Sequence, residues 1–179
     1  MEGKLFVTPN QLRDMSYALG NLVKTPPDFL VALWRGGTPI GCCVHEFLKR
    51  KYKGKNIDHI SVRTSRYTGT EGNKEVKIHG LNYIFENAKI GDTVLIVDDV
   101  WDAGTTLKAV MDKLSILKVN VETAVLFFKP QNNLYPDLSP NYYVEKSERW
   151  LVFPHELEGL SKEEIISNYG EGVWYMLNE

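Results

Sequence analysis

The chain has 179 residues, of which 43% are hydrophobic and 25% are charged, with a formal net charge of −2 and a pI near 6.1. These values predict one soluble globular domain with a substantial core and argue against a protein whose main activity is bulk nucleic-acid binding. No stretch approaches the roughly 20 apolar residues that cross a bilayer, so no membrane association is expected.

The N-terminal ten residues lack the apolar core of a signal peptide. The only two cysteines, Cys42 and Cys43, are neighbours, and adjacent cysteines rarely bridge one another. We therefore expect a cytoplasmic protein with reduced thiols.

The first predicted element is a helix. Thr8-Pro9-Asn10-Gln11 matches a capping box with proline at the first helical position, and Pro26 and Pro27 close the segment. Four apolar residues are predicted to line one face: Leu12, Met15, Leu19 and Leu22.

Two predicted strands and a second helix follow. The apolar strand Phe29–Leu33 ends at Trp34-Arg35-Gly36-Gly37, and Pro39 begins a helix whose basic end, 49–55, is expected to be solvated. Residues 57–62 form the second predicted strand. The polar segment 63–77 is expected to be a mobile loop or a loose hairpin. The predicted apolar face of the helix comprises Ile40, Cys43, Val44, Phe47 and Leu48.

The segment 93–107, TVLIVDDVWDAGTTL, is the most informative in the chain. Its apolar run 94–97 predicts a strand that is buried on both faces, as in a parallel sheet. Three carboxylates follow, and the turn 103–106 opens a helix. That helix carries an apolar stripe of Leu107, Val110, Met111, Leu114 and Leu117.

The rest of the chain contains short elements. Residues 121–128 predict a strand that ends at Lys129-Pro130, and 131–141 is rich in turn residues. Residues 142–145 and 150–153 are predicted to be extended, and Ser161 is predicted to cap a last helix.

Strands that alternate with helices predict an α/β fold with a central parallel sheet flanked by helices. In such sheets ligands bind beyond the carboxyl ends of the strands, where the winding reverses. With a strand order of 2-1-3-4-5, that point lies between the first and third strands. Trp34–Gly37 and Asp98–Thr106 would then flank one crevice.

The adjacent carboxylates Asp98 and Asp99 repel each other unless a cation or donor hydroxyls compensate, and sugar hydroxyls with Mg²⁺ would supply both. The alternative is a solvated strand end. The DDxxD string also occurs in all-helical terpenoid enzymes, but here it follows a strand and appears once. An acidic pocket of the response-regulator type would leave the Gly-Thr-Thr turn unexplained.

Asp102 stands beside a turn suited to anion binding. Its carboxylate can take a proton from a heterocycle or cap the helix, and both roles are compatible. Thr105 and Thr106 offer hydroxyls, and the turn offers amides, to a 5′-phosphate. Arg35 is followed by two glycines, which allow an anion to approach the backbone closely. An Arg-Gly-Gly turn is common by itself, so the argument for a binding role depends on the position of this turn directly after the first strand.

These motifs resemble those of type I phosphoribosyltransferases. VLIVDDVWDAGTTL resembles the family's phosphoribosyl-diphosphate (PRPP) motif, and LWRGG resembles its pyrophosphate loop. Residues 125–156 are similar to the purine hood of xanthine-guanine and hypoxanthine phosphoribosyltransferases. The resemblance implies a single domain, 1–179, with a core of about 28–130 and a small hood built from the N-terminal helix and the C-terminal segment, about 1–25 and 131–179.

The resemblance also implies site residues. Asp98 and Asp99 would hold the ribose hydroxyls and the metal ion, and Asp102 would face the purine N7 as the catalytic residue. The pyrophosphate loop, Arg35 and Gly36, would hold pyrophosphate, and a non-proline cis peptide is expected there. The 5′-phosphate would be bound by Ala103, Gly104, Thr105 and Thr106.

Two positions depart from the family pattern. Trp101 replaces a smaller aliphatic residue and would either narrow the site or pack against a neighbour, and Ala103 replaces a threonine but keeps its amide. The mobile lid would comprise Ser65, Arg66 and Tyr67, in place of the usual Ser-Tyr pair.

Base identity depends on Lys129 and Trp150. The ammonium group donates hydrogen bonds and so suits the O6 of hypoxanthine, guanine or xanthine, while Trp150 would stack on the base and the Leu151 backbone would contact its edge. The alternatives are an exposed strand end for Lys129 and core packing for Trp150. No chemistry is assigned to His155, and the remaining histidines, His45, His59 and His79, are expected to be structural or exposed.

The expected function is therefore Mg²⁺-dependent salvage of a 6-oxopurine with PRPP, by a homodimer or homotetramer. One alternative is transfer to another base such as a pyrimidine. Another is a PRPP-sensing regulator that binds nucleic acid, for which 49–55 could supply an RNA-binding face. Asp102 favours the enzyme, and the segment before Phe29 is too short for an added DNA-binding domain.

Overall fold

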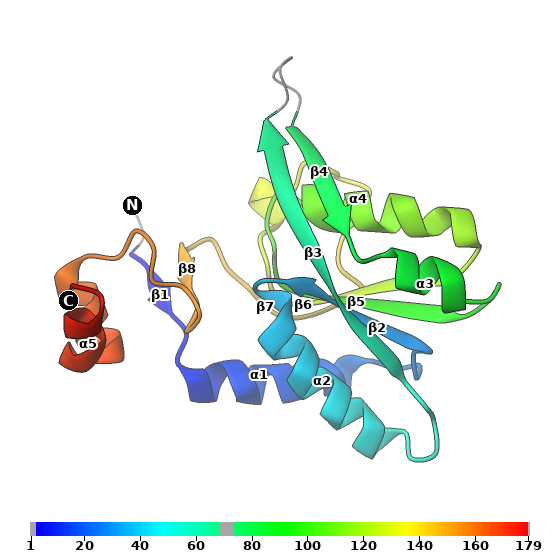
Figure 1. Cartoon of the computed structure of the whole chain (residues 1–179), viewed down its shortest axis with the longest axis horizontal. Helices are drawn as coiled ribbons and strands as arrows, with labels where there is room; N and C mark the ends of the chain where they lie inside the picture. The colour runs from blue at the N-terminus through cyan, green and yellow to red at the C-terminus, as the bar shows by residue number, and fades with distance from the viewer. Residues whose placement is uncertain (1–2, 69–73, 179) are drawn as a thin grey trace. The chain divides into compact units, whose positions relative to one another are not determined.

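The computed structural model describes the backbone of residues 3–68 and 74–178 and the side chains of 3–65 and 76–178 (Figure 1). The chain forms two compact units. The core unit comprises Arg13–Glu148, and the terminal unit comprises Met1–Leu12 with Arg149–Glu179. The single-domain organisation stays a prediction.

A six-stranded sheet with the order β4-β3-β2-β5-β6-β7 forms the centre of the core unit. All neighbouring strands are parallel except the pair β3 and β4. The predicted order 2-1-3-4-5 is confirmed, since it corresponds to β3-β2-β5-β6-β7, with β4 added at one edge. The strands are β2 (Phe29–Trp34), β3 (Asp58–Thr68), β4 (Lys74–His79), β5 (Thr93–Trp101), β6 (Asn120–Phe128) and β7 (Tyr142–Lys146).

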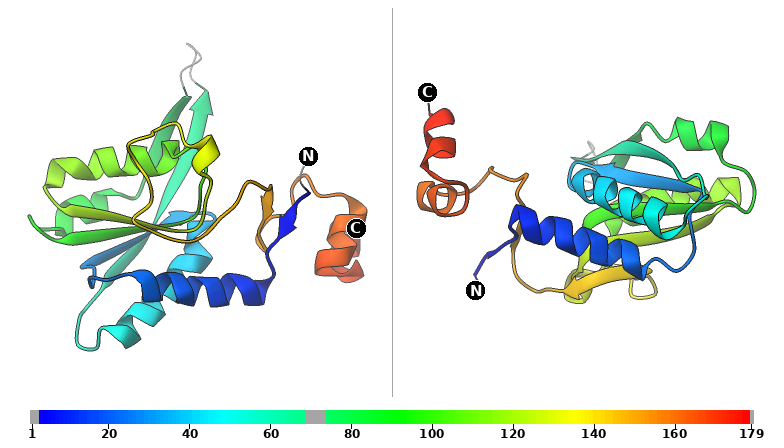
Figure 2. Two further views of the ribbon diagram at one scale, coloured as in Figure 1. Left: turned by 180° about the vertical axis from the view of Figure 1, so that it is seen from behind. Right: turned by 90° about the horizontal axis from the view of Figure 1, so that it is seen from below.

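Helices cover both faces of this sheet. Helix α2 (Gly37–Lys51) lies on one face, and α3 (Asn82–Asn87) and α4 (Thr105–Leu114) lie on the other (Figures 1 and 2). A Cβ on Gly41 would stand 2.6 Å from the Cβ of Ala32, so glycine is what lets α2 approach β2 closely. On the opposite face the core includes Val31, Ile96, Leu107, Val110 and Leu114.

Helix α1 (Pro9–Leu22) has residues in both units. The predicted capping box is confirmed, because the Thr8 N–H donates to Gln11 Oε1 at 2.9 Å and the Gln11 N–H donates to Thr8 Oγ1 at 3.2 Å. The predicted apolar face is wrong at Leu22, whose side chain is 43% exposed, whereas Ser16, Leu19 and Val23 are buried. A stripe at 12, 16, 19 and 23 follows the 3.6-residue period more closely than one that ends at 22.

The polar segment after the second predicted strand is a hairpin. Strand β3 continues to Thr68 and pairs antiparallel with β4 from Arg63↔His79 to Thr68↔Lys74. Of the two alternatives for 63–77, the structure supports the hairpin. Helix α3 was not predicted.

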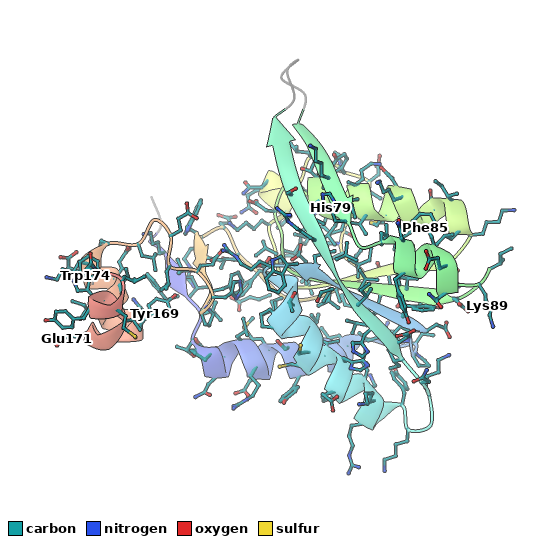
Figure 3. All side chains as sticks on the ribbon, in the orientation of Figure 1. His79, Phe85, Lys89, Tyr169, Glu171 and Trp174 are labelled. Carbon is teal, nitrogen blue, oxygen red and sulfur yellow. The ribbon has the colours of Figure 1, made fainter. Side chains whose placement is uncertain are left out.

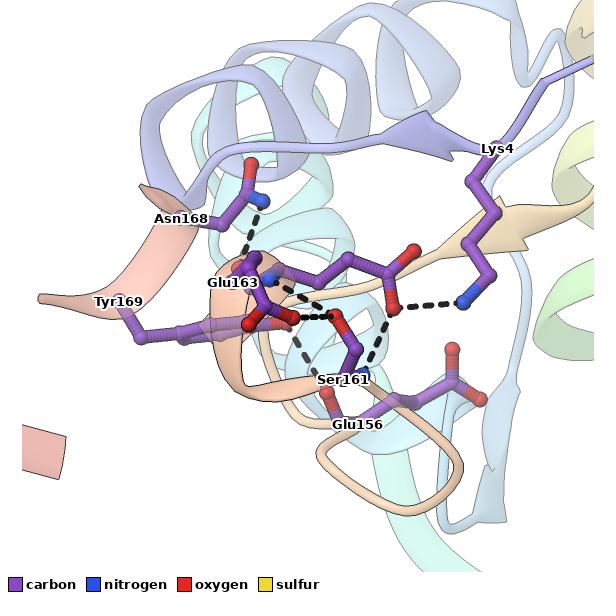
Figure 4. Close-up of polar contacts among 7 residues, drawn as sticks. Lys4, Glu156, Ser161, Glu163, Asn168 and Tyr169 are labelled. Carbon is purple, nitrogen blue, oxygen red and sulfur yellow. Dashed lines mark hydrogen bonds and ion pairs between the residues drawn. The ribbon is translucent and has the colours of Figure 1, made fainter. Parts of the chain in front are cut away.

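The terminal unit contains β1 (Leu5–Phe6) paired in parallel with β8 (Leu151–Val152), followed by α5 (Lys162–Tyr169) and α6 (Glu171–Met176). The predicted cap of α5 is confirmed: Ser161 and Glu164 form a reciprocal capping box, and Lys4 pairs with Glu164 at 2.8 Å (Figure 4). The Tyr169 hydroxyl donates to the carbonyls of Phe153 and Glu156.

This unit is smaller than the predicted hood, because β7 joins the central sheet and the larger part of α1 belongs to the core unit. Within the described ranges, no helix has both the length and the apolar character needed to cross a membrane.

Candidate functional site

A cavity of about 250 Å³ lies where β2 and β5 end, at the predicted switch point of the sheet. The predicted crevice is thus present, and it gathers residues from both predicted motifs together with Thr64 of β3. Its lining comprises Trp34, Arg35, Thr64, Asp98, Asp99, Val100, Asp102, Gly104, Thr106 and Leu107.

The loop after β2 lies directly against the end of β5. A Cβ on Gly36 would overlap the Asp99 carboxylate, and a Cβ on Gly37 would overlap the Val97 carbonyl oxygen. Glycine at 37 is therefore required for this approach to the β5 backbone, and glycine at 36 leaves the Asp99 carboxylate in its place. The peptide bond between Trp34 and Arg35 is cis, within the loop where a cis bond was expected, and both side chains are exposed, Trp34 by 53%.

The adjacent carboxylates Asp98 and Asp99 are half-buried at the edge of the cavity. Each accepts a hydrogen bond from the next backbone N–H: Asp98 Oδ1 from Asp99 at 3.0 Å and Asp99 Oδ1 from Val100 at 2.7 Å. Among the described residues no group of three His, Cys, Asp or Glu side chains could hold a metal ion by itself. Two carboxylates fit Mg²⁺, which commonly completes its shell with water and substrate phosphate oxygens.

The turn that opens α4 has a backbone conformation that suits an anion. Gly104 adopts the left-handed conformation with φ of +77° and, as the N-cap, offers no side-chain cap to the helix. No N-cap side chain therefore competes for the first amides of α4, which lie at the positive end of its dipole. Thr105 and Thr106 are half-buried in this first turn, and Thr106 lines the cavity.

Trp101 packs against neighbours rather than narrowing the cavity. Its side chain is fully buried, its ring meets Phe128 edge-on at 6.5 Å, and its indole N–H donates to Asn133 Oδ1 at 3.1 Å. A Cβ on Gly104 would stand 2.6 Å from the indole nitrogen, so this tryptophan also requires glycine at the start of α4.

Asp102 lines the same cavity and accepts a hydrogen bond from Asn132 Nδ2 at 2.6 Å. Asn132 and Asn133, which hold Asp102 and Trp101, were not predicted from the sequence. The feature of the sequence that could have pointed to them is their position in the turn that follows Lys129-Pro130. Ala103 contributes a carbonyl that accepts a hydrogen bond from the Leu134 N–H at 3.2 Å.

The predicted base-contacting residues belong to different units, and each is described within its own. Lys129, at the end of β6, is only 8% exposed, so the alternative of an exposed strand end is wrong. Trp150 is 68% exposed, so the alternative of core packing is wrong. Leu151 is buried in β8, opposite Leu5.

Of the predicted lid, Ser65 is half-buried in β3 and pairs with Lys77 of β4, while the side chains of Arg66 and Tyr67 lie outside the described residues. Thr64 was missed as a lining residue. Residues two apart on a strand share a face of the sheet, so Thr64 lies on the same face as the buried Val62 and could have been identified from that spacing.

No histidine is among the described residues that line this cavity. The ring centroids of His45 and His59 lie 4.4 Å apart with the rings tilted by 38°, and a ring nitrogen of His45 lies 3.0 Å from the Ile57 carbonyl oxygen. His155 stacks on Phe153 at 5.5 Å. His79, on β4, is exposed (Figure 3).

Comparison with known proteins gives consistent matches. A hypoxanthine-guanine phosphoribosyltransferase of Staphylococcus epidermidis is 31% identical over 139 residues, which cover 76% of this chain and 73% of that protein. The solved purine phosphoribosyltransferase of Pyrococcus horikoshii Ot3 has a TM-score of 0.70 and 26% identity, covering 90% of this chain and 99% of the other.

The fold is shared more widely. A hypothetical protein of Neisseria gonorrhoeae, solved with bound ppGpp, has a TM-score of 0.75 at 23% identity, covering 96% of this chain and 98% of the other. The family model described as phosphoribosyl transferase domain matches residues 8–158. This chain therefore belongs to the phosphoribosyltransferase family, whose members are glycosyltransferases, and within it resembles the enzymes that act on purines.

Proposed function

We propose that this enzyme transfers the 5-phosphoribosyl group of PRPP to a 6-oxopurine in the presence of Mg²⁺ and releases pyrophosphate. The observation that carries the proposal is the cavity between β2 and β5, where the Arg35–Gly37 loop, the carboxylates of Asp98 and Asp99 and the start of α4 meet. A basic loop, an acidic pair and a helix N-terminus match the diphosphate, ribose and 5′-phosphate of PRPP in turn.

Each part of PRPP is assigned to residues of this cavity. The amides and hydroxyls of Ala103–Thr106 bind the 5′-phosphate, because the first turn of α4 has glycine as its N-cap. Arg35 and the backbone at Gly36 bind the diphosphate. Asp98 and Asp99 accept hydrogen bonds from the ribose hydroxyls.

Mg²⁺ fits the same pair of carboxylates. Asp98 and Asp99 would hold the ion together with oxygens of the substrate and water, in keeping with the small carboxylate count of the site. When bound, the ion neutralises charge that develops on the leaving pyrophosphate.

In the proposed reaction a ring nitrogen of the purine forms a bond to C1′ of the ribose as the bond from C1′ to pyrophosphate breaks, with inversion. The carboxylate of Asp102 accepts the proton that the base loses. Most of the acceleration would come from positioning and from charges placed around an oxocarbenium-like centre, from which lid closure would exclude water.

Lys129 supports a 6-oxopurine as the acceptor. A lysine that is 92% buried needs a partner for its charge, and the O6 of hypoxanthine, guanine or xanthine accepts hydrogen bonds whereas the amine of adenine donates them. Trp150, exposed in the terminal unit, is proposed to stack on the base beside Leu151.

The test is nucleotide formation from PRPP and Mg²⁺ with hypoxanthine, guanine, xanthine, adenine, uracil and orotate in separate reactions. We expect turnover of at least one 6-oxopurine, and loss of that turnover with EDTA. Lys129→Ala should raise KM for the base by about 10- to 100-fold, as loss of a charged hydrogen bond does. Preference for adenine or a pyrimidine would overturn the base assignment.

Absence of turnover with every base, combined with tight PRPP binding and a salt-dependent shift of RNA, would favour the regulator instead. A homodimer or homotetramer is also proposed, and sedimentation of the full chain would test it.

A further inference from the structure

The turn after β6 is tied to the segment that carries Asp102. We define the asparagine turn as residues 129–134. At its start the Lys129 N–H donates to the Trp101 carbonyl at 2.9 Å, and at its end the Leu134 N–H donates to the Ala103 carbonyl at 3.2 Å. The backbone on both sides of Asp102 is thus fixed to this turn.

The side-chain amide of Asn133 restrains the asparagine turn through four hydrogen bonds. Its Oδ1 accepts hydrogen bonds from Trp101 Nε1 at 3.1 Å and from the Tyr135 N–H at 3.2 Å. Its Nδ2 donates to the carbonyls of Tyr135 and Leu138 at 3.0 and 2.7 Å. An amide that makes this many hydrogen bonds, one of them to a fully buried tryptophan, has little freedom to rotate.

Asn132 is held by the same turn. Its backbone N–H donates to the Lys129 carbonyl at 3.1 Å, and Pro130 restricts the backbone at the start of a one-turn 3-10 helix, η2 (Pro130–Asn132). From this position Asn132 Nδ2 donates to Asp102 Oδ1 at 2.6 Å, a short, charge-assisted contact that spans 30 residues of sequence.

We propose that Asn132 is a positioning residue that fixes the rotamer of Asp102, so that Oδ1 is held by the amide and Oδ2 is presented to the base. This inference rests on the proposed function of Asp102 as the proton acceptor. Because the same turn begins at Lys129, it also fixes the proton acceptor relative to the lysine proposed to bind O6. Trp101, which departs from the family pattern, anchors the arrangement through its hydrogen bond to Asn133.

The proposal predicts a specific kinetic pattern. Asn132→Ala should lower kcat by about tenfold, equal to about 1.4 kcal/mol, and leave KM for PRPP within about twofold of wild type. Asn132→Asp keeps the size of the side chain but replaces the donor with a like charge. At pH 8 it should lower kcat further than alanine does.

The matched control is Gln131→Ala, in the same turn. The Gln131 amide donates to the Ser147 carbonyl at 3.2 Å and not to Asp102, so kcat should stay at the wild-type value. In an Asp102→Asn background, Asn132→Ala should change kcat by less than about twofold, because Asn132 acts through Asp102. Wild-type kcat in Asn132→Ala, or an undiminished tenfold loss in the Asp102→Asn background, would overturn the proposal.

A structural readout separates this inference from the proposed function. Crystal structures of the wild-type protein and Asn132→Ala should show the Asp102 carboxylate in one rotamer in the former and in a different or divided one in the latter. An unchanged rotamer would overturn the role of Asn132 even in an active enzyme. A wild-type protein that turns over no base would overturn the proposed function, and the two crystal structures would still decide whether Asn132 orients Asp102.

Discussion

Replacing each of the two glycines after Arg35 with alanine should have a different effect: Gly36→Ala should weaken ligand binding, and Gly37→Ala should lower stability. Gly36 has φ of −63° and ψ of −37°, which alanine adopts readily, and the nearest obstacle to its Cβ is the Asp99 carboxylate. A side-chain end can rotate away. At Gly37 the obstacles are the Val97 carbonyl oxygen and, at 2.9 Å, the Asp98 Cα, and this backbone of β5 cannot rotate away.

The size of the effect of Gly36→Ala on stability and on PRPP binding can be worked out from the displacement of the Asp99 carboxylate. In Gly36→Ala the Asp99 carboxylate loses its hydrogen bond from Val100, which costs about 0.5–1.5 kcal/mol, and the alanine regains about 0.4–1 kcal/mol through the unfolded state. The free energy of unfolding should therefore change by less than about 1 kcal/mol. Moving a charged acceptor of the ligand costs about 1.5–3 kcal/mol of binding, or about 10- to 150-fold in Kd for PRPP with Mg²⁺.

Gly37→Ala should instead lower the free energy of unfolding by about 2–3 kcal/mol, in the upper range for overpacking. Urea denaturation and titration calorimetry with PRPP and Mg²⁺ would measure the two quantities. Gly172→Ala, on α6 with open space around it, is the control and should bind PRPP normally. Wild-type affinity in Gly36→Ala, or wild-type stability in Gly37→Ala, would refute the reasoning.

Three further substitutions test other parts of the fold. Trp101→Ala should lower the free energy of unfolding by about 3–5 kcal/mol in urea denaturation, since the ring is fully buried; a cost below about 1 kcal/mol would contradict its packing role. At Asp28, burial raises the carboxyl pKa, but hydrogen bonds from Lys55 and the Thr93 N–H outweigh it and hold the pKa below its usual value. The ionised Asp28 carboxylate therefore stabilises the folded state at pH values above its unfolded pKa of about 3.9. This stabilisation is lost as pH falls through the pKa that Asp28 has in the folded protein. Asp28→Asn should therefore have a lower melting temperature than wild type at pH 7, and the difference should shrink as pH falls through the folded pKa of Asp28; a difference that stays constant with pH would exclude this cause. Ser161→Ala should weaken the cap of α5 by about 1 kcal/mol, seen as about fivefold faster amide exchange in that helix, and unchanged exchange would show that the capping box contributes nothing.

The sheet and the crevice could be predicted because they depend on strong patterns. The buried run at Val94–Val97 and the alternation of strands with helices fix a parallel sheet, and the rule for ligand sites at strand ends places two separate motifs together. The glycines at 36 and 37 were recognised as permissive, although only the structure shows that a Cβ would meet the Asp99 side chain at 36 and the Val97 backbone at 37.

The features that were missed have weak local signals. Helix α3 has six residues, too few to display a helical period, and the outer parts of β3 and β4 carry polar residues that hide their alternation. The burial of Lys129 depends on tertiary packing that its strand-end position does not reveal. Asn132 acts across 30 residues, and a neutral amide in a turn is no different in sequence from an ordinary turn residue.

The most direct test of the proposed site is a crystal structure of the protein with PRPP and Mg²⁺. We predict the 5′-phosphate at the amides and hydroxyls of Ala103–Thr106, the ribose hydroxyls at Asp98 and Asp99, and the diphosphate at Arg35 and Gly36. A ligand found elsewhere, or one whose phosphates avoid both the loop after β2 and the start of α4, would contradict the assignment.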